Sequence, residues 1–260
     1  MVSRKVLTIL LIGVCAGMLF GCGSEEKDIP AEQDEAAVSE EQIPEMSAID
    51  SDKIVASVYG MAPSYEKNYP DTASLAEASS LVVYGEVLGM EYEESDPWIY
   101  TTGVYVKVLQ PVKGNCGKDD IIKVGSGQKL QTVQAYLDSF SADDGSRDQA
   151  RAGFEQYADD ELREIYIQEL DQGDIAPVVG QKNVYFLEES AAFDADETYY
   201  RLNGPRGSYT EIGEGEFAGT SVIGNLSAGM YPMESLGTDE IADCGAATYT
   251  LDELTGDIKQ

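Results

Sequence analysis

The stretch that decides the fold covers residues 81–88 and reads LVVYGEVL. Branched and aromatic side chains dominate it, which is typical of a β-strand packed on at least one face. A short helix is predicted just upstream, over residues 71–77. Its N-cap is either Asp71 or Ser74, because Ser74 and Glu77 fit the S-x-x-E pattern of a capping box.

Two further strands are predicted downstream. Residues 104–109 alternate in such a way that Val104, Val106 and Val108 share one face. A turn-rich segment follows, and residues 121–124 (IIKV) form the next strand.

The pattern then changes to a helical one. Apolar residues spaced by three and four predict an amphipathic helix of six or seven turns over residues 146–171. Residues 183–188 form a fourth strand, and residues 199–203 with 207–212 form a fifth that is paired or bent. The apolar face of the helix consists of Phe154, Ala158, Leu162, Ile165 and Tyr166.

This order of elements predicts a fold that is mainly β with some α. It is that of a five-stranded OB-like barrel with a helix inserted between strands 3 and 4. We expect one domain over residues 51–260, with the barrel at about 78–213 and a loop-rich extension at 214–260. A capping box at residues 250–253 predicts a short C-terminal helix packed on the barrel through Leu251, Leu254 and Ile258.

The first 21 residues have the layout of a secretory signal peptide. Arg4 and Lys5 precede an apolar run, residues 6–20, that is short for a hydrocarbon core of about 30 Å. The run ends in Leu19-Phe20-Gly21-Cys22, which resembles the bacterial lipobox. That resemblance implies cleavage before Cys22, a lipid on its sulfur, and a place on the extracytoplasmic face of the cell membrane. An ordinary signal peptide cut elsewhere, or an uncleaved anchor, is the alternative.

Residues 22–50 form an acidic tether. They contain ten acidic residues, one lysine and no aromatic residue. Low hydrophobicity and high like charge predict disorder. The tether is either a spacer that lifts the domain from the membrane or a solvated tail without a specific role.

Four phrases within the barrel resemble a group of bacterial secreted or lipid-anchored domains that are similar to the netrin-like and tissue-inhibitor-of-metalloproteinase barrel. The resemblance implies an OB-type barrel, and it makes an inhibitor a candidate function. Those inhibitors chelate zinc through a free N-terminal cysteine, a role that an acylated Cys22 behind a tether does not fit. The phrases are residues 80–87, 108–114, 179–187 and 204–209.

Composition excludes several kinds of chemistry. The chain has 260 residues, with 17 basic and 48 acidic side chains, a net charge of −31 and no histidine. A Ser-His-Asp triad, a Cys-His dyad or a histidine-bound zinc cannot come from this chain alone. Nucleic acid is an unsuitable partner, because its phosphates require lysine and arginine. The glycine runs lack the spacing of phosphate-binding loops, so no cofactor is expected.

Few residues stand out as candidate site residues. Cys116 and Cys244 remain beside the lipidation site, and they form either a disulfide or two free thiols. Trp98 and Tyr100 lie between the first two strands, where they contact a ligand or cap the barrel end. The acidic clusters match no calcium loop, so solvated turns are expected and no metal site is assigned.

These observations predict a membrane-anchored envelope lipoprotein that acts as a non-enzymatic binding module. Its partner would be an envelope protein or a glycan. An inhibitor or regulator of an envelope enzyme is one alternative. A hydrolase that uses carboxylates is the other, although 48 acidic residues leave its catalytic pair unassigned.

Overall fold

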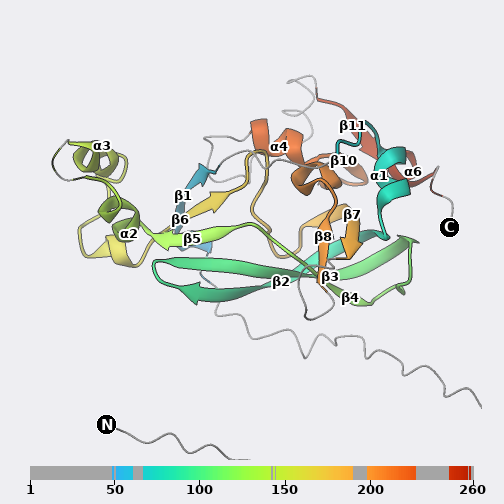
Figure 1. Cartoon of the computed structure of the whole chain (residues 1–260), viewed down its shortest axis with the longest axis horizontal. Helices are drawn as coiled ribbons and strands as arrows, with labels where there is room; N and C mark the ends of the chain where they lie inside the picture. Colours follow the sequence, from blue (N-terminus) through green and yellow to red (C-terminus); the bar gives the residue numbers. More distant parts are fainter. Residues whose placement is uncertain are drawn as a thin grey trace, which may run out of the picture. The chain divides into compact units, whose positions relative to one another are not determined.

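The computed structural model describes residues 49, 51–60, 67–141, 143, 145–189, 198–226, 246–256 and 258 (Figure 1). All of them belong to one of the two compact units of the chain, residues 37–260. The signal peptide and nearly all of the tether lie outside the described residues, so the expectations about them stay predictions.

Five strands close into a mixed β-barrel. They are β2 (Leu81–Ser95), β3 (Trp98–Lys113), β4 (Ile121–Val124), β7 (Lys182–Glu189) and β8 (Thr198–Arg201). Around the wall the order is β2, β3, β4, β8, β7 and back to β2, and only the β4–β8 pair is parallel. The predicted fold class is therefore confirmed: the domain is mainly β with some helices and contains a closed five-stranded barrel.

Alternating apolar residues fill the barrel interior. Val104, Val106 and Val108 of β3 all belong to this core, as the period of two predicts. Gly85 of β2 lies against them, and a Cβ atom there would be 2.5 Å from Cγ1 of Val106. Close packing between β2 and β3 therefore requires the glycine in the deciding stretch.

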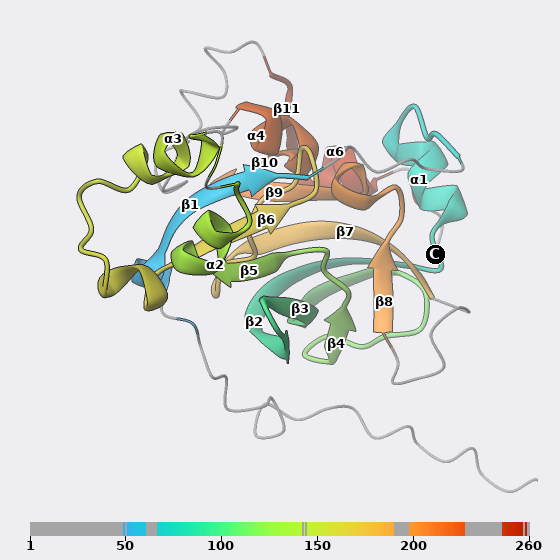
Figure 2. The ribbon, with the colours of Figure 1, turned by 60° about the vertical axis from the view of Figure 1, so that its left-hand side comes forward.

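The outer face of β2 and β7 is also buried (Figure 2). Val82, Val184 and Phe186 contribute to a second core on that side. Because neighbouring residues of a strand point to opposite faces, residues 183–187 of β7 are all buried. The covering elements are α1 (Thr72–Ala78), β9 (Ser208–Gly213), β10 (Glu216–Gly219), β11 (Thr248–Thr250) and α6 (Leu251–Thr255).

The predicted fifth strand is two strands that share one edge of β7. Strand β8 pairs with the end of β7, at residues 187–189. After the short 3-10 turn η4 (Gly204–Gly207), β9 pairs with residues 183–185 of the same strand. A Cβ atom at Gly207 would lie 1.9 Å from the carbonyl oxygen of Leu202, so this change of direction needs glycine.

Both helices begin at a residue that the sequence offers as a cap. Asp71 caps α1, where its carboxylate accepts a hydrogen bond from the Ser74 amide at 2.8 Å, so the alternative box led by Ser74 is wrong. The capping box of α6 is confirmed, since Thr250 and Glu253 bond to each other's backbone amides. Strand β10 and helix α4 (Thr220–Leu226) occupy part of the extension that was predicted as loops.

The long helix predicted over residues 146–171 is wrong. Only α3 (Ser146–Ala152) is α-helical there; a 3-10 turn, η3 (Glu161–Arg163), and a strand, β6 (Tyr166–Leu170), follow it. Three residues of the predicted apolar face, Phe154, Leu162 and Ile165, still share one core, whereas Ala158 is exposed. Their spacing therefore reported a common buried side and not a continuous helix.

The segment between β4 and β7, called the insert below (residues 129–171), extends the sheet. It contains β5 (Lys129–Thr132), α2 (Val133–Asp138), α3, η3 and β6. Strand β6 pairs with β5 on one side and, in parallel, with β1 (Ile54–Tyr59) on the other; a 3-10 turn, η2 (Ser51–Lys53), precedes β1. Strand β5 pairs in turn with β3 of the barrel.

Buried polar side chains hold this extension to the barrel. Thr101 of β3 donates a hydrogen bond to the Gln128 side chain at 2.9 Å, and Gln128 donates to Gln168 of β6 at 2.9 Å. Gln168 donates to Ser57 of β1 at 2.7 Å. These hydrogen bonds give each of the two buried glutamine amides a partner, as buried polar groups require.

The second core predicts a large effect for Phe186→Ala. Phe186 is 0% exposed, and truncation of a buried phenylalanine costs about 3–5 kcal/mol of unfolding free energy because a cavity remains. Urea unfolding followed by circular dichroism measures the loss. Val178→Ala is the matched control, since Val178 is 57% exposed, and it should change stability by less than about 0.5 kcal/mol. Equal losses in the two variants would contradict the two-sided core.

Candidate functional site

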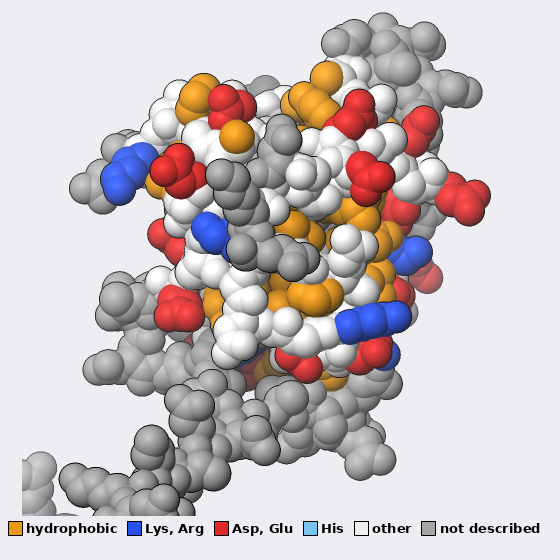
Figure 3. All heavy atoms as spheres, turned by 90° about the vertical axis from the view of Figure 1, so that its right-hand side faces the viewer, with side chains coloured by type: hydrophobic (Ala, Val, Ile, Leu, Met, Phe, Trp, Pro, Cys, Tyr) orange, Lys and Arg blue, Asp and Glu red, His pale blue; other side chains and the backbone are white. Residues whose placement is uncertain are grey.

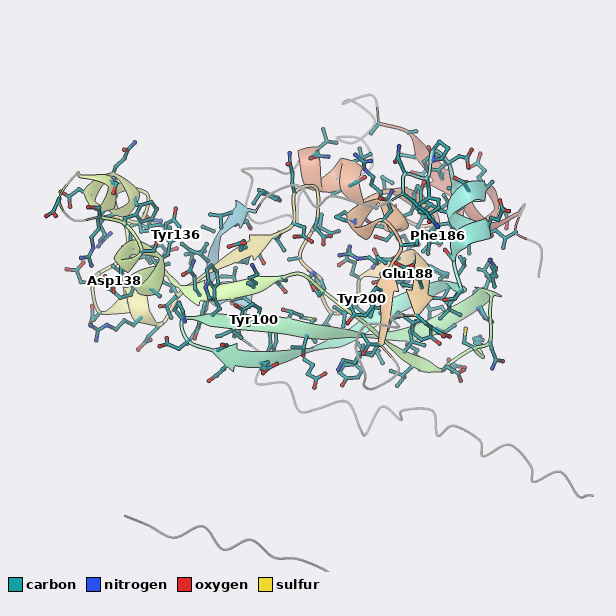
Figure 4. All side chains as sticks on the ribbon, in the orientation of Figure 1. Tyr100, Tyr136, Asp138, Phe186, Glu188 and Tyr200 are labelled. Carbon is teal, nitrogen blue, oxygen red and sulfur yellow. The ribbon has the colours of Figure 1, made fainter. Side chains whose placement is uncertain are left out.

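Trp98 and Tyr100 lie at the start of β3, beside the insert. Tyr100 is in register with Lys129 of β5, and the Lys129 ammonium lies 5.7 Å from the centroid of the Trp98 ring. Both aromatic side chains are partly buried, and Tyr100, labelled in Figure 4, lies where β3 is paired with β2 on one side and β5 on the other. The structure thus places them against a neighbouring strand, and ligand contact at these residues stays a prediction.

The cysteine predictions fall largely outside the described residues. Cys22 and Cys244 are not among them, so lipidation and the candidate disulfide stay predictions. Cys116 is half-buried between β3 and β4 and packs against the barrel core. Burial, and then the charge of Asp120, raise the pKa of its thiol, which lowers the fraction of reactive thiolate.

A buried ion pair lies at one end of the barrel. Arg201, the last residue of β8, bonds through both terminal nitrogens to the carboxylate of Asp174, with Nη1 to Oδ1 at 2.8 Å. The side chains are 15% and 4% exposed. Oδ1 of Asp174 also accepts the Ile175 amide at 2.9 Å, so the buried carboxylate is well satisfied.

Other polar groups complete this barrel-end cluster. Asn183 donates a hydrogen bond to the Tyr185 hydroxyl at 2.9 Å, and burial raises the pKa of Tyr185 to about 12. The hydroxyls of Ser208 and Thr210 each bond to Thr220. They surround a cavity of about 30 Å³, which holds about two water molecules. The polar groups of the cluster bond to one another and leave little room for a substrate.

Two carboxylates near this cluster have different environments. Burial, and then the charge of Asp174, raise the pKa of Asp171, whereas Asp174 is engaged by Arg201. Contrasting environments are typical of paired catalytic acids. Catalysis would need both groups to reach the substrate, but Asp174 is enclosed and its oxygens are occupied.

The insert carries a larger and open hollow. Its volume is about 310 Å³, at the lower end of the range for ligand sites, roughly 300–1,000 Å³. Helices α2 and α3 form it at the end of the domain where Figure 4 shows Tyr136 and Asp138. We call it the arginine hollow, and its polar side chains are Gln134, Arg147, Asp148, Arg151, Asp159 and Arg163.

The three arginines are held differently. Arg147 pairs with Asp138, and both are well exposed. Arg151 is fixed, because it donates to the carbonyl oxygens of Phe154 and Tyr157 and also to Asp159. Arg163 is exposed on η3. The arrangement presents guanidinium groups from two elements to one open space.

Sequence reasoning missed both sets of residues. Arg201 interrupts the otherwise uncharged stretch 198–203 (TYYRLN), which was the one available signal for a buried charge. Asp174 lies just beyond the long helix predicted over residues 146–171, and the arginines of the hollow were assigned to that helix. Their partners are distant in sequence or lie across turns that local patterns do not define.

Within the described ranges, no group of three or more acidic or cysteine side chains is arranged to hold a metal ion. Each helix found in those ranges is too short or too polar to cross a bilayer. Comparison of the chain with protein-family models, with curated proteins and with solved structures found no match. The functional argument therefore rests on the chain's own geometry.

Removal of one partner of the buried ion pair should be costly. Arg201→Met leaves Asp174 charged and enclosed, so we expect a loss of about 3–5 kcal/mol in unfolding free energy. The double variant Asp174→Leu/Arg201→Met should recover most of that loss, because no charge is left buried. Arg206→Met, at an exposed arginine, is the control. A double variant no more stable than the single one would refute the assignment.

Proposed function

We propose that this chain is a lipid-anchored protein of a bacterial cell envelope and that its barrel domain binds an envelope protein or glycan without chemistry of its own. The lipobox-like sequence ending at Cys22 supports the anchor. The arginine hollow is the observation that carries the binding role, because it is open, polar and large enough for a ligand group.

The barrel-end cluster favours binding over catalysis. Its charged and hydroxyl groups bond to one another, and burial raises the pKa of Tyr185 to about 12, so this phenol is harder to ionise than an exposed one. A hydrolase would need accessible acids in a cleft. The inhibitor alternative rests on the resemblance to the netrin-like and metalloproteinase-inhibitor barrel, with which a closed five-stranded barrel is compatible.

The surface charge limits the partner classes. Acidic side chains are spread around a central group of hydrophobic ones on the face drawn in Figure 3, and the whole chain carries a net charge of −31. Such a surface repels nucleic acid and anionic lipid headgroups at close range. The membrane is therefore a partner only through the lipid, and binding takes place at a local site.

The anchor is tested by Cys22→Ser. We expect this variant to leave the membrane fraction or to remain as an unprocessed precursor, because the thiol that takes the lipid is gone. Cys15→Ser, inside the same apolar run, should behave as the unmodified chain. Membrane fractionation and the mass of the N-terminal peptide report the outcome. A lipid-bearing peptide from the Cys22→Ser chain would rule the proposal out.

The binding role is tested by capture with the full lipidated chain. The bait is immobilised through a C-terminal tag, exposed to solubilised envelope at low and moderate salt, and its eluate is analysed by mass spectrometry and by sugar analysis. We expect one enriched protein or glycan. Arg147→Gln/Arg163→Gln removes two charges from the hollow, and Lys118→Gln/Arg206→Gln removes two exposed charges elsewhere.

Loss of capture by the first pair alone assigns binding to the hollow. Equal capture by both pairs keeps the binding module but moves its site. If the unmodified chain enriches nothing, the binding role is wrong.

A further inference from the structure

The arginine hollow concentrates positive charge in an acidic protein. Three of the six arginines in the chain lie within residues 147–163, and all three line the same hollow. At physiological salt, interactions between exposed charges are screened beyond about 8 Å. An anionic group inside the hollow therefore responds mainly to the charges that line it, three guanidinium groups and the carboxylates of Asp148 and Asp159, of which Asp159 is paired with Arg151.

Two of these arginines are available to a ligand. Arg163 makes no ion pair or side-chain hydrogen bond with the described residues. The pair between Arg147 and Asp138 is exposed on both sides, 42% and 52%, and exposed pairs of this kind contribute about 0–1 kcal/mol, so a ligand carboxylate can replace Asp138. Arg151 stays in place, because its carbonyl partners fix it.

The remaining wall residues suit hydroxyl groups. Asp148 and Asp159 can accept hydrogen bonds, although Asp159 already accepts one from Arg151; the Gln134 amide nitrogen donates to Asp138 at 2.9 Å, which leaves its carbonyl oxygen to accept. Leu137 and Leu162 also line the hollow, but each is only 2% exposed and offers little apolar surface. A peptide that binds through apolar or aromatic anchors would find little surface here, and an acidic peptide is the remaining peptide class that the test must separate from a sugar.

We propose that the arginine hollow binds a carboxylate-bearing sugar, an inference that rests on the proposed binding function and names its ligand class. The carboxylate lies in the fork of Arg163 with Arg147 beside it, since the planar guanidinium matches a carboxylate in two parallel hydrogen bonds. Hydroxyls of the ring bond to Asp148, Asp159 and Gln134. A glycan with acidic units would then present one such unit to the insert.

The test titrates the full chain in detergent with matched sugars. Glucuronate and galacturonate are the acidic probes, and glucose and galactose carry a hydroxymethyl group at C6 in place of the carboxylate. Inorganic phosphate and a triglutamate peptide are the other anionic probes. Calorimetry and ligand-observed NMR measure affinity, and circular dichroism verifies that each variant is folded.

We expect saturable binding of at least one uronate, at least about tenfold tighter than the matching neutral sugar, and weaker at high salt. Arg163→Gln should weaken uronate binding by about tenfold or more, because it removes a charge-assisted two-point contact. Arg163→Lys keeps the charge and loses the planar two-point contact, so its affinity for the uronate should lie between those of the unmodified chain and Arg163→Gln. Arg206→Gln, at an exposed arginine outside the hollow, should have no effect.

The proposal would be overturned if neither uronate binds, or if a uronate and its neutral sugar bind equally. It would also be overturned if triglutamate or phosphate is the only probe that binds in an Arg163-dependent way. Envelope capture that survives Arg147→Gln/Arg163→Gln would also overturn it. In that last case the proposed binding function stands, so the two failures are distinguishable.

Discussion

Burial of β7 on both faces is the constraint on which the rest of the domain depends. Tyr185 and Leu187 face the barrel interior, while Val184 and Phe186 face the second core. A strand in that position cannot tolerate an exposed side, so α1, the strands β9 to β11 and α6 must cover the barrel wall. Each large apolar side chain removed from water there contributes about 1.5–3 kcal/mol to the unfolding free energy. Loss of the covering elements would remove several such contributions.

The barrel strands were predictable because their information is local. Residues 81–88, 104–109 and 183–188 show alternation or continuous apolar character over their own length, and each lies in a strand. The insert was not predictable in the same way. Strand β6 is defined by its pairing with β1, more than a hundred residues earlier, and with β5. The helical spacing of apolar residues in the insert indicated only that several of them share a core.

The candidate sites show the same limit. Arg201 and Asp174 lie 27 residues apart, on a strand and in a connection, and the barrel brings them together. The sequence marked Trp98 and Tyr100 because the connection between the first two strands of an OB-type barrel often contacts ligands. It did not reveal that Tyr100 would pair in register with Lys129 of β5. The arginine hollow depends on turns after α3, where Arg151 bonds to the carbonyls of Phe154 and Tyr157. That these arginines line one hollow is visible only once the path of the folded backbone is known.

The parallel seam between β4 and β8 has a consequence for the dynamics of the barrel. Among the described residues, Lys123 is in register with Thr198 and Val124 with Tyr199, and the Gly125 amide donates to the Tyr199 carbonyl oxygen at 2.8 Å. Proteins open locally where backbone bonding is sparse, at free energies below that of global unfolding. Amide hydrogens at this seam should exchange with solvent sooner than those of the long β2–β3 hairpin. Arg201 is the last residue of β8, so its ion pair with Asp174 opposes local opening of the seam. The same pair links opening of the barrel to movement of the connection that follows the insert.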